Sequence, residues 1–295
     1  MLALAALLET VAVATTAAPP PPPPPVRVGV LVNHVAMAAS DGPSSKATVL
    51  ENAEVFGRAI QAAANSSVEL LVFPEAYALS VGPSRSGYWE PLWGSPGSNA
   101  CRSATASACP LQKRLSCLAA QHKVALAYNL FATRGGAKRI TEVAVDSDGT
   151  LLATYDKVHL FPVTEALNGA TAGTNQPTSF ELLGRRWGMI ICYEGEYPFV
   201  SGNWSQMNGL AAQNATSWLW SVGSMVSIDA TAKELAREYS VRVAATQDSS
   251  PNLVQGQLIC GGKAAQDCSP YADSALKELP RGYTGRPFVR SAVLD

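Results

Sequence analysis

The sequence predicts an α/β fold in which strands and helices alternate. Val26–Asn33 is rich in β-branched residues, as strands are. Val68–Phe73 is a continuous apolar run that is too short for a helix and is ended by Pro74. Between these runs, apolar residues recur at steps of three and four, as on one face of an amphipathic helix: Val49, Ala53, Phe56, Ile60 and Ala63. The order strand, helix, strand implies a right-handed βαβ unit and a sheet with covered faces.

Further elements follow in the middle of the chain. Ser80–Pro110 is a long loop rich in Gly, Pro and Ser, and its aromatic residues favour an ordered segment that forms a pocket wall. Leu111–His122 is expected to be helical, and Val124–Phe131 to be a strand. Ile140–Val145 and Leu151–Tyr155 alternate on either side of an Asp-Gly pair, which predicts a hairpin.

The last third of the chain is expected to add a second group of strands. Phe180–Leu183 and Trp187–Ile191 form a predicted strand pair, and Gly209–Ala212 is interpreted as another strand. A helix over Ile228–Tyr239 and a strand over Val241–Thr246 follow. The tail beyond this strand is rich in Gly, Ser and Pro and is expected to end without an apolar anchor.

Composition excludes several classes of function. The chain has 295 residues, of which 47% are hydrophobic, and a net charge of −1. This balance provides neither the basic footprint of a nucleic-acid-binding protein nor a basic patch for membrane binding. The three histidines lie at no metal-ligand spacing, so neither a metal nor another cofactor is expected.

The N-terminal sequence predicts export. Residues 1–18 resemble a signal peptide, residues 19–25 form a polyproline linker, and no transmembrane helix is expected once the leader is removed. Glycosylation sequons occur at Asn65, Asn203 and Asn214. Together these features predict a secreted protein or one of the secretory-pathway lumen.

Six cysteines leave the disulfide connectivity open. If Cys192 is a working thiol, five remain. Close pairs such as Cys101–Cys109 and Cys260–Cys268 would then leave Cys117 unpaired.

Three chemically active residues each follow a predicted strand. Glu75 follows Val68–Phe73, Lys157 follows Leu151–Tyr155, and Cys192 follows the apolar strand Trp187–Ile191. Ligands of open α/β sheets bind at the carboxyl ends of strands, so we expect the three to converge. Taken singly, each has a structural interpretation: Glu75 as a solvated turn acid, Lys157 as a surface lysine and Cys192 as a buried core cysteine.

Together, the three residues suit attack on an amide. A thiol with an ordinary pKa near ~8.5 needs a base or a nearby cation to become a nucleophile. Glu75 would take the proton, and Lys157 would stabilise the oxyanion of the tetrahedral intermediate. The products would be a thioester and a free amine.

The motifs that carry these residues resemble those of the nitrilase superfamily of carbon–nitrogen hydrolases. They are LLVFPEAY with Glu75, ATYDKVHLF with Lys157, and GMIICYEGEYPF with Cys192, and their order and spacing agree with the family. Within the superfamily the chain is most similar to the vanin (pantetheinase) and biotinidase branch. The segment LQKRLSCLA, with Cys101 in the loop before it, carries that similarity.

This resemblance implies a four-layer α-β-β-α sandwich and hydrolysis of a secondary amide without a metal. Carried over, Glu75 is the general base, Lys157 the electrostatic stabiliser and Cys192 the nucleophile. Tyr193 would supply a backbone oxyanion donor, and Glu165 a supporting acid. The resemblance also places Asn214 behind the cysteine, where a glycan would crowd the pocket, so Asn65 and Asn203 are the preferred acceptors.

The chain departs from that branch in two places. Glu194 stands where the branch has an Asp, which leaves the acyl specificity open and makes Glu194 a candidate support or substrate residue. The branch also carries a β-rich second domain that this chain is too short to hold whole. We therefore expect a hydrolase domain over residues 26–250 and, over residues 251–295, a tail or the start of a truncated second domain.

The sequence thus predicts an exported amidohydrolase that acts on a small amide. Pantetheine is the first candidate substrate and biocytin is the second. The alternatives are a superfamily amidase for another small amide and a catalytically silent, secreted binding protein of the same fold. A small-molecule amide is the expected partner, and a homo-oligomer is compatible with the sequence.

Overall fold

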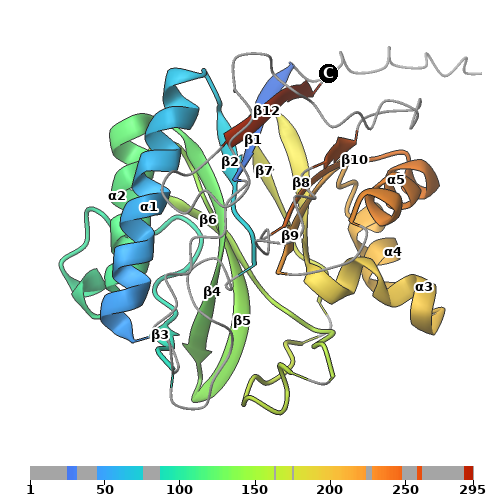
Figure 1. Ribbon diagram of the computed structural model, residues 1–295, viewed down its shortest axis with the longest axis horizontal. Helices are drawn as coiled ribbons and strands as arrows, with labels where there is room; N and C mark the ends of the chain where they lie inside the picture. The colour runs from blue at the N-terminus through green and yellow to red at the C-terminus, as the bar shows by residue number, and fades with distance from the viewer. Residues whose placement is uncertain are drawn as a thin grey trace, which may run out of the picture.

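In the computed structural model the chain forms two β-sheets packed face to face with helices outside each sheet (Figure 1). The structure describes residues 25–31, 45–75, 87–162, 164–174, 176–223, 228–247, 258–260 and 289–294. The predicted signal peptide lies outside these residues, as does the predicted linker up to residue 24. The expected α-β-β-α sandwich is confirmed.

The first sheet has the strand order β12-β1-β2-β4-β5-β6, and β3 also pairs with β4. β1, β2 and β4 are mutually parallel, whereas β5, β6 and β12 join antiparallel. Its strands are β1 (Val26–Leu31), β2 (Leu70–Val72), β3 (Glu90–Pro91), β4 (Ala125–Arg134), β5 (Ala137–Val145), β6 (Leu151–Asp156) and β12 (Val289–Leu294). The predicted hairpin is therefore β5–β6, and its turn holds Gly149 at φ 85°.

The second sheet has the order β11-β10-β9-β8-β7. β8, β9 and β10 run parallel, and the outer strands β7 and β11 are antiparallel to them. The strands are β7 (Ser179–Leu182), β8 (Arg185–Ile191), β9 (Ser217–Val222), β10 (Arg242–Gln247) and β11 (Leu258–Cys260). The predicted strand pair before Cys192 is confirmed as β7 and β8.

Helices α1 (Lys46–Asn65) and α2 (Pro110–His122) cover the outer face of the first sheet. Ser45 caps α1 by accepting a hydrogen bond from the N–H of Thr48, and the predicted apolar face of the helix is buried. Phe56 of this face stacks on Phe73, with 4.2 Å between ring centroids. The periodic apolar face therefore fixes how α1 lies on the sheet.

Helices α3 (Tyr197–Ser201), α4 (Ser205–Ala212) and α5 (Ile228–Tyr239) lie on the side of the second sheet (Figure 1). The expected strand at Gly209–Ala212 is wrong, because these residues are the last turn of α4. Met207 and Leu210 are buried at helical spacing, and Gly209 lies so close to Pro177 that a Cβ would be 2.3 Å from its Cγ. The strand of this region is β9, which the sequence analysis missed.

Two strands from beyond residue 250 join the sheets. β11 pairs with β10, and β12 pairs with β1 along its length from Val26↔Leu294 to Leu31↔Val289. Val289 is buried, so the expectation of a tail without an apolar anchor is wrong. The predicted boundary at residue 250 does not separate these strands from the hydrolase fold.

The structure describes the long segment before α2 from residue 87 onward. Trp89 packs on Phe131, with 5.0 Å between ring centroids. The buried carboxylate of Glu90 accepts hydrogen bonds from the N–H groups of Leu111 and Gln112 and so caps the first turn of α2. The aromatic residue and the acid thus hold this segment against the first sheet.

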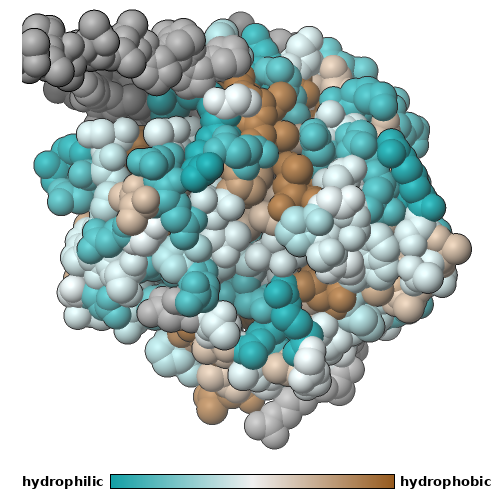
Figure 2. Space-filling view, turned by 180° about the vertical axis from the view of Figure 1, so that it is seen from behind, coloured by the Kyte–Doolittle hydropathy of each residue, from teal (hydrophilic) through white to brown (hydrophobic). Residues whose placement is uncertain are grey.

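Part of the exposed apolar surface lies near the segments that carry Lys157 and Cys192. Seen from behind, the surface is mostly hydrophilic or neutral, with an apolar band running from the upper edge toward the middle (Figure 2). Among the described residues the exposed large apolar side chains are Phe161, Leu167, Phe199, Val200 and Val293. Phe161 follows Lys157 closely in sequence, and Phe199 and Val200 belong to α3, just after Cys192. No described helix combines the length and apolar character needed to cross a bilayer.

The described disulfide joins Cys101 to Cys117 on α2, and Cys109 stays a buried free thiol. Of the pairings that the sequence left open, Cys101–Cys109 is therefore excluded. The bond closes the turn-rich segment ahead of α2 onto the helix.

Replacing both Cys101 and Cys117 by Ser should lower the free energy of unfolding by about 3 kcal/mol, because the bond closes a loop with a sequence separation of 16. Urea unfolding measures the loss. The control is Cys109→Ala, which leaves the disulfide intact and should cost clearly less. Equal losses in both proteins would contradict the assignment of the bond.

Candidate active site

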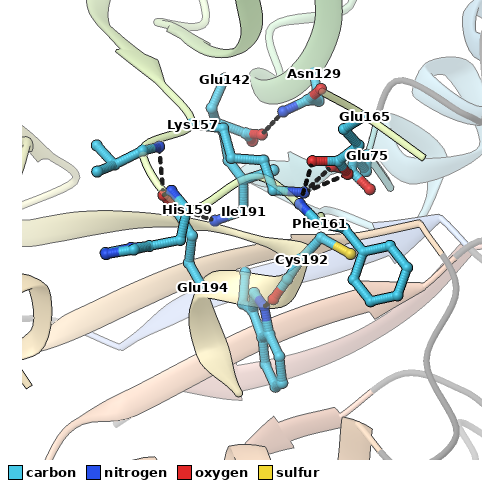
Figure 3. A network of polar contacts seen from close by, with 12 residues as sticks. Glu75, Asn129, Glu142, Lys157, His159, Phe161, Glu165, Ile191, Cys192 and Glu194 are labelled. Carbon is cyan, nitrogen blue, oxygen red and sulfur yellow. Dashed lines mark hydrogen bonds and ion pairs between the residues drawn. The ribbon is translucent and has the colours of Figure 1, made fainter. Parts of the chain in front are cut away.

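A buried lysine held between two carboxylates forms the centre of the site (Figure 3). The Nζ of Lys157 lies 2.7 Å from Oε1 of Glu75 and 2.6 Å from Oε1 of Glu165. The side chains of Lys157 and Glu75 are fully buried. Burial by itself lowers the pKa of Lys157, but the nearby Glu75, Cys192 and Glu165 raise it well above its usual value. The lysine therefore stays a cation inside the protein.

The first sheet delivers Glu75 and Lys157 from the carboxyl ends of β2 and β6. Lys157 directly follows β6, and its N–H donates to the carbonyl of Ile140 at 2.8 Å. The N–H of Glu75 donates to the carbonyl of Val222 on β9 at 3.3 Å. The backbone of Glu75 is thus tied to the second sheet, which carries the cysteine.

Cys192 follows β8 at a sharp, strained turn. Its φ is 46°, in the left-handed region that non-glycine residues seldom occupy. Its carbonyl accepts a hydrogen bond from the indole N–H of Trp220 at 2.9 Å. A Cβ on Gly195 would lie 2.3 Å from Cζ2 of Trp220, so only glycine fits beside that ring. The turn holds the thiol at the end of the strand, 7% exposed.

The thiol is protonated at rest. Burial and the charge of Glu75 raise the pKa of Cys192 to about 12, whereas the charge of Lys157 and the backbone N–H of Gly223 oppose that rise. Such a thiol needs a base before it can attack. Oε2 of Glu75 is buried without a hydrogen-bond partner among the described residues. One oxygen of Glu75 therefore binds the lysine, and the other is free to accept a proton.

Glu165 completes the charged cluster. Its Oε2 accepts the N–H of Phe161 at 2.8 Å, while its Oε1 binds Lys157. Burial first, and then the charge of Glu75, raise the pKa of Glu165 to about 7, although Lys157 opposes the rise. The structure places Glu165 where a supporting acid would lie.

Glu194 joins the lysine segment to the cysteine turn. Its Oε1 accepts the N–H of Val158 at 2.7 Å and the hydroxyl of Tyr155 at 2.6 Å. Its Oε2 accepts the N–H of Ile191 at 2.9 Å, and burial raises its pKa. Since both oxygens are bound within the protein, the placement fits a supporting residue rather than a substrate contact.

Aromatic rings lie around the cysteine turn. The ring of Tyr193 contacts Phe161 edge-on at 5.6 Å and Tyr197 at 5.7 Å between centroids. His159 stacks on Tyr197 at 3.8 Å, and burial lowers its pKa, so it is a neutral, stacked ring at neutral pH. The backbone N–H of Tyr193 is the next one after Cys192, and its role as an oxyanion donor stays a prediction.

The predicted glycan acceptors Asn65 and Asn203 are both exposed. Asn214 is also exposed, and it precedes β9, whose first residue Ser217 pairs with Trp187 at the start of β8. Cys192 follows the other end of β8. Asn214 thus lies toward the opposite end of β8 from the cysteine, and the expectation that a glycan there would crowd the pocket is wrong.

Sequence reasoning missed Glu142, Asn129 and Ser221, three buried polar residues behind the charged cluster. Glu142 and Asn129 pair across β5 and β4, and Ser221 lies on β9. The available signal was a glutamate that alternates with the apolar residues Ile140 and Ala144 in a strand. Among the described residues there is no group of three His, Cys, Asp or Glu side chains arranged to hold a metal ion.

Comparison with known proteins places this site in a family. A family model described as carbon–nitrogen hydrolase matches residues 36–214, more than half of the chain. The chain belongs to the carbon–nitrogen hydrolase family. The matched range includes Glu75, Lys157, Glu165 and Cys192, so the buried cluster lies within this carbon–nitrogen hydrolase domain.

Solved structures of the same fold include an amidase from Nesterenkonia sp., which is 20% identical with a TM-score of 0.66 and covers 91% of this chain and 90% of its own. A mutant of the Nesterenkonia sp. AN1 amidase, 19% identical with the same TM-score and coverage, shows covalent addition of the acetamide moiety of fluoroacetamide at its active-site cysteine. A curated relative, a hydrolase in the agr operon of Staphylococcus lugdunensis, is 37% identical over 59 residues. That match spans 20% of this chain and a quarter of the relative's length.

Replacing Gly195 by Ala should lower the free energy of unfolding by about 1–3 kcal/mol, because the new Cβ overlaps Trp220. Thermal unfolding, followed by tryptophan fluorescence, measures the loss. The control is Gly57→Ala in α1, whose Cβ would lie at an ordinary 3.5 Å from Leu118. A Gly195→Ala protein as stable as the control would show that the turn does not depend on this contact.

Replacing Lys157 by Met should destabilise the protein by about 3–5 kcal/mol at pH 8, because it leaves two buried carboxylates without their cation. The loss should shrink toward pH 5, because the pKa of Glu165 is raised to about 7 and its protonation removes one of those charges. Urea unfolding at the two pH values measures both effects. Lys113→Met is the control, since its Nζ donates to the carbonyl of Ser103, and its smaller loss should not depend on pH in this way. A pH-independent loss for Lys157→Met would contradict the charge pairing.

Proposed function

We propose that this protein is an exported amidohydrolase that cleaves a small secondary amide through a thioester on Cys192. The observation that carries the proposal is the free Oε2 of Glu75, in a cluster whose charges reach the thiol. Lys157 fixes the other oxygen of Glu75 at 2.7 Å. The site thus combines a proton acceptor, a cation and a nucleophile.

Nucleophilic attack begins with the proton of the thiol. Oε2 of Glu75 takes the proton from Sγ of Cys192 as Sγ bonds to the amide carbon and the carbonyl π-electrons move to oxygen. The strongly raised pKa of Cys192 means that a free thiolate is scarce, so proton transfer and attack belong to one step. The left-handed turn already holds the thiol in place.

Lys157 suits the oxyanion that this attack creates. An ammonium group has three protons, of which Glu75 and Glu165 take two, so one N–H remains for the oxyanion. The backbone N–H of Tyr193 is the proposed second donor. Because these donors are fixed before substrate arrives, little reorganisation is needed as charge develops.

Collapse of the intermediate releases the amine. The C–N bond breaks, the leaving nitrogen takes the proton from Glu75, and a thioester remains on Cys192. Glu75 then accepts a proton from water as the water oxygen attacks the thioester carbon. Breaking the C–S bond frees the acid, and the proton on Glu75 returns to the thiolate.

We propose pantetheine-like or biotinyl amides as the substrate class, with pantetheine first. The motif similarity to the vanin and biotinidase branch supports this choice, and the Cys101–Cys117 disulfide lies in the segment that carries that similarity. The 41% exposed ring of Phe161 and the neighbouring Tyr193 offer apolar contacts for an acyl chain. A disulfide is typical of proteins from oxidising compartments, and this supports export.

A catalytically silent binding protein of the same fold is the second candidate, and an amidase for another small amide is the third. The pKa of about 12 for Cys192 favours the silent protein, because a buried, protonated thiol is the resting form of an inert cysteine. The cost of burying Lys157 with two carboxylates counts against it, since a silent protein has no chemical use for the cluster.

Intact-mass measurement after brief incubation with pantetheine, biocytin and a panel of small amides tests the proposal. We expect a transient acyl adduct, together with release of the amine, and both should be lost in Cys192→Ala. Cys109→Ala removes the other described free thiol and should keep adduct and release. An adduct from a different amide alone would favour the third candidate. Neither adduct nor amine from any amide, in protein shown to be folded, would favour the silent protein.

A further inference from the structure

A buried glutamate that the proposed mechanism does not use lies near the charged cluster and above it in the view of Figure 3. Glu142 is 1% exposed, on the face of β5 that meets the second sheet. Oε2 of Glu142 accepts the amide N–H of Asn129 at 3.0 Å, and its Oε1 lies 2.9 Å from Oγ of Ser221. The carboxyl group therefore bridges the two sheets.

The contacts of Ser221 indicate the protonation state of Glu142. Oγ of Ser221 also lies 2.8 Å from the carbonyl oxygen of Phe73, which can only accept. A hydroxyl has one proton, so Ser221 cannot donate fully to both neighbours. If Glu142 carries a proton on Oε1, it donates to Ser221, Ser221 donates to Phe73, and every contact is satisfied. An ionised Glu142 would compete with Phe73 for the single hydroxyl proton.

The bridge ends on the backbone that carries the proposed base. Phe73 precedes Glu75 by two residues, and Val222, next to Ser221, accepts the N–H of Glu75. Gly223, the next residue of that segment, donates its N–H to the thiol of Cys192. Three successive residues after Trp220 thus contact the base segment and the nucleophile, and Ser221 is the one that Glu142 orients.

We propose that Glu142 is a positioning residue that acts as a neutral carboxylic acid, orienting Ser221 toward Phe73 and so fixing Glu75 against the second sheet. Its direct partners are an amide and a hydroxyl, which suits a neutral acid in a buried site. The proposal rests on the proposed function for its effect on catalysis, and on geometry alone for its effect on stability.

The surroundings of Glu142 agree with a neutral acid. Burial raises its pKa to about 8, the contacts with Asn129 and Ser221 oppose that rise, and the carboxylates of Glu75 and Glu194 add to it. The phenol of Tyr128, whose own pKa is raised well above its usual value, stays neutral in this range. At neutral pH the acid is mostly protonated, and it ionises as the pH rises through about 8.

Glu142→Gln tests the protonation state through stability. The unfolded chain loses this proton near the ordinary pKa of 4.5, whereas the folded protein keeps it to about 8. The folded state therefore binds more protons between these values, and native stability falls as pH rises across that range. Glutamine donates and accepts as the neutral acid does but does not ionise. We therefore expect the melting temperature of Glu142→Gln, relative to the native protein, to rise steadily from pH 5 to pH 8.

Glu90→Gln is the matched control. Glu90 is another fully buried glutamate of the first sheet, but it accepts only from donors: Tyr88, Leu111 and Gln112. A glutamine there turns an N–H group toward other donors, so Glu90→Gln should be less stable than the native protein at pH 5 and at pH 8. Glu142→Gln should gain stability relative to the native protein as the pH rises, whereas Glu90→Gln should be destabilised at both pH values. This difference distinguishes a neutral acid from a carboxyl group that only accepts hydrogen bonds.

The kinetic arm uses the amide identified by the adduct experiment. Glu142→Ala should lose about 10- to 100-fold in kcat with little change in KM, because Glu75 is no longer held in place. Glu142→Gln should recover most of that kcat at pH 7. Above pH 8 its kcat should decline less than that of the native protein, because glutamine does not ionise. Ser221→Ala should resemble Glu142→Ala.

The outcomes separate this inference from the proposed function. A melting-temperature difference between Glu142→Gln and the native protein that stays flat or falls with pH would overturn it, and so would failure of Glu142→Gln to fold. If the thermal pattern is as expected but no amide is cleaved by any protein, the neutral acid stands and the amidase proposal fails. If Glu142→Gln loses as much kcat as Glu142→Ala, the positioning role is wrong.

Discussion

The site depends on one costly interaction, the burial of a lysine cation between two carboxylates. Lys157 is removed from water and stays charged only because Glu75 and Glu165 lie within 2.7 Å of its Nζ. The three groups come from two strand ends and the loop after β6, so the first sheet must be formed before they can meet. The cysteine comes from the other sheet. A complete site therefore exists only when the two sheets have closed on one another.

Strand β9 makes that closure specific. Ser221 and Val222 end this strand, and Gly223 follows it. In turn they contact the carbonyl of Phe73, the N–H of Glu75 and the thiol of Cys192. A shift of β9 by one residue would exchange the faces of its side chains and break these contacts together. Trp218 and Trp220 resist such a shift because both are fully buried, and Trp220 also binds the cysteine turn.

The protonation states form a consistent set. Burial keeps the proton on Cys192 and on Glu142, whose charged forms would lie near the carboxylate of Glu75. The cation is kept because its carboxylate partners outweigh desolvation. The resting site thus concentrates its charge on Lys157 and the carboxylates in contact with it. A protonated thiol is protected from stray oxidation, since the thiolate is the reactive form.

What the sequence determined by itself was local. Periodicity and turn residues act over a few positions, so they predicted the apolar face of α1, the β5–β6 hairpin and the strand before Cys192. The three motifs could be predicted as well, because each is a short continuous stretch of sequence. The short run at Gly209–Ala212 was misread and β9 was missed, since a brief apolar segment is a strand or a helix according to what it packs against. Only the tertiary structure decided the Cys101–Cys117 bond, the pairing of β12 with β1 and the bridge through Glu142. The strand pairing and the bridge join residues far apart in the chain, and the bridge also depends on how the two sheets pack. The disulfide depends on how the segment before α2 folds onto that helix.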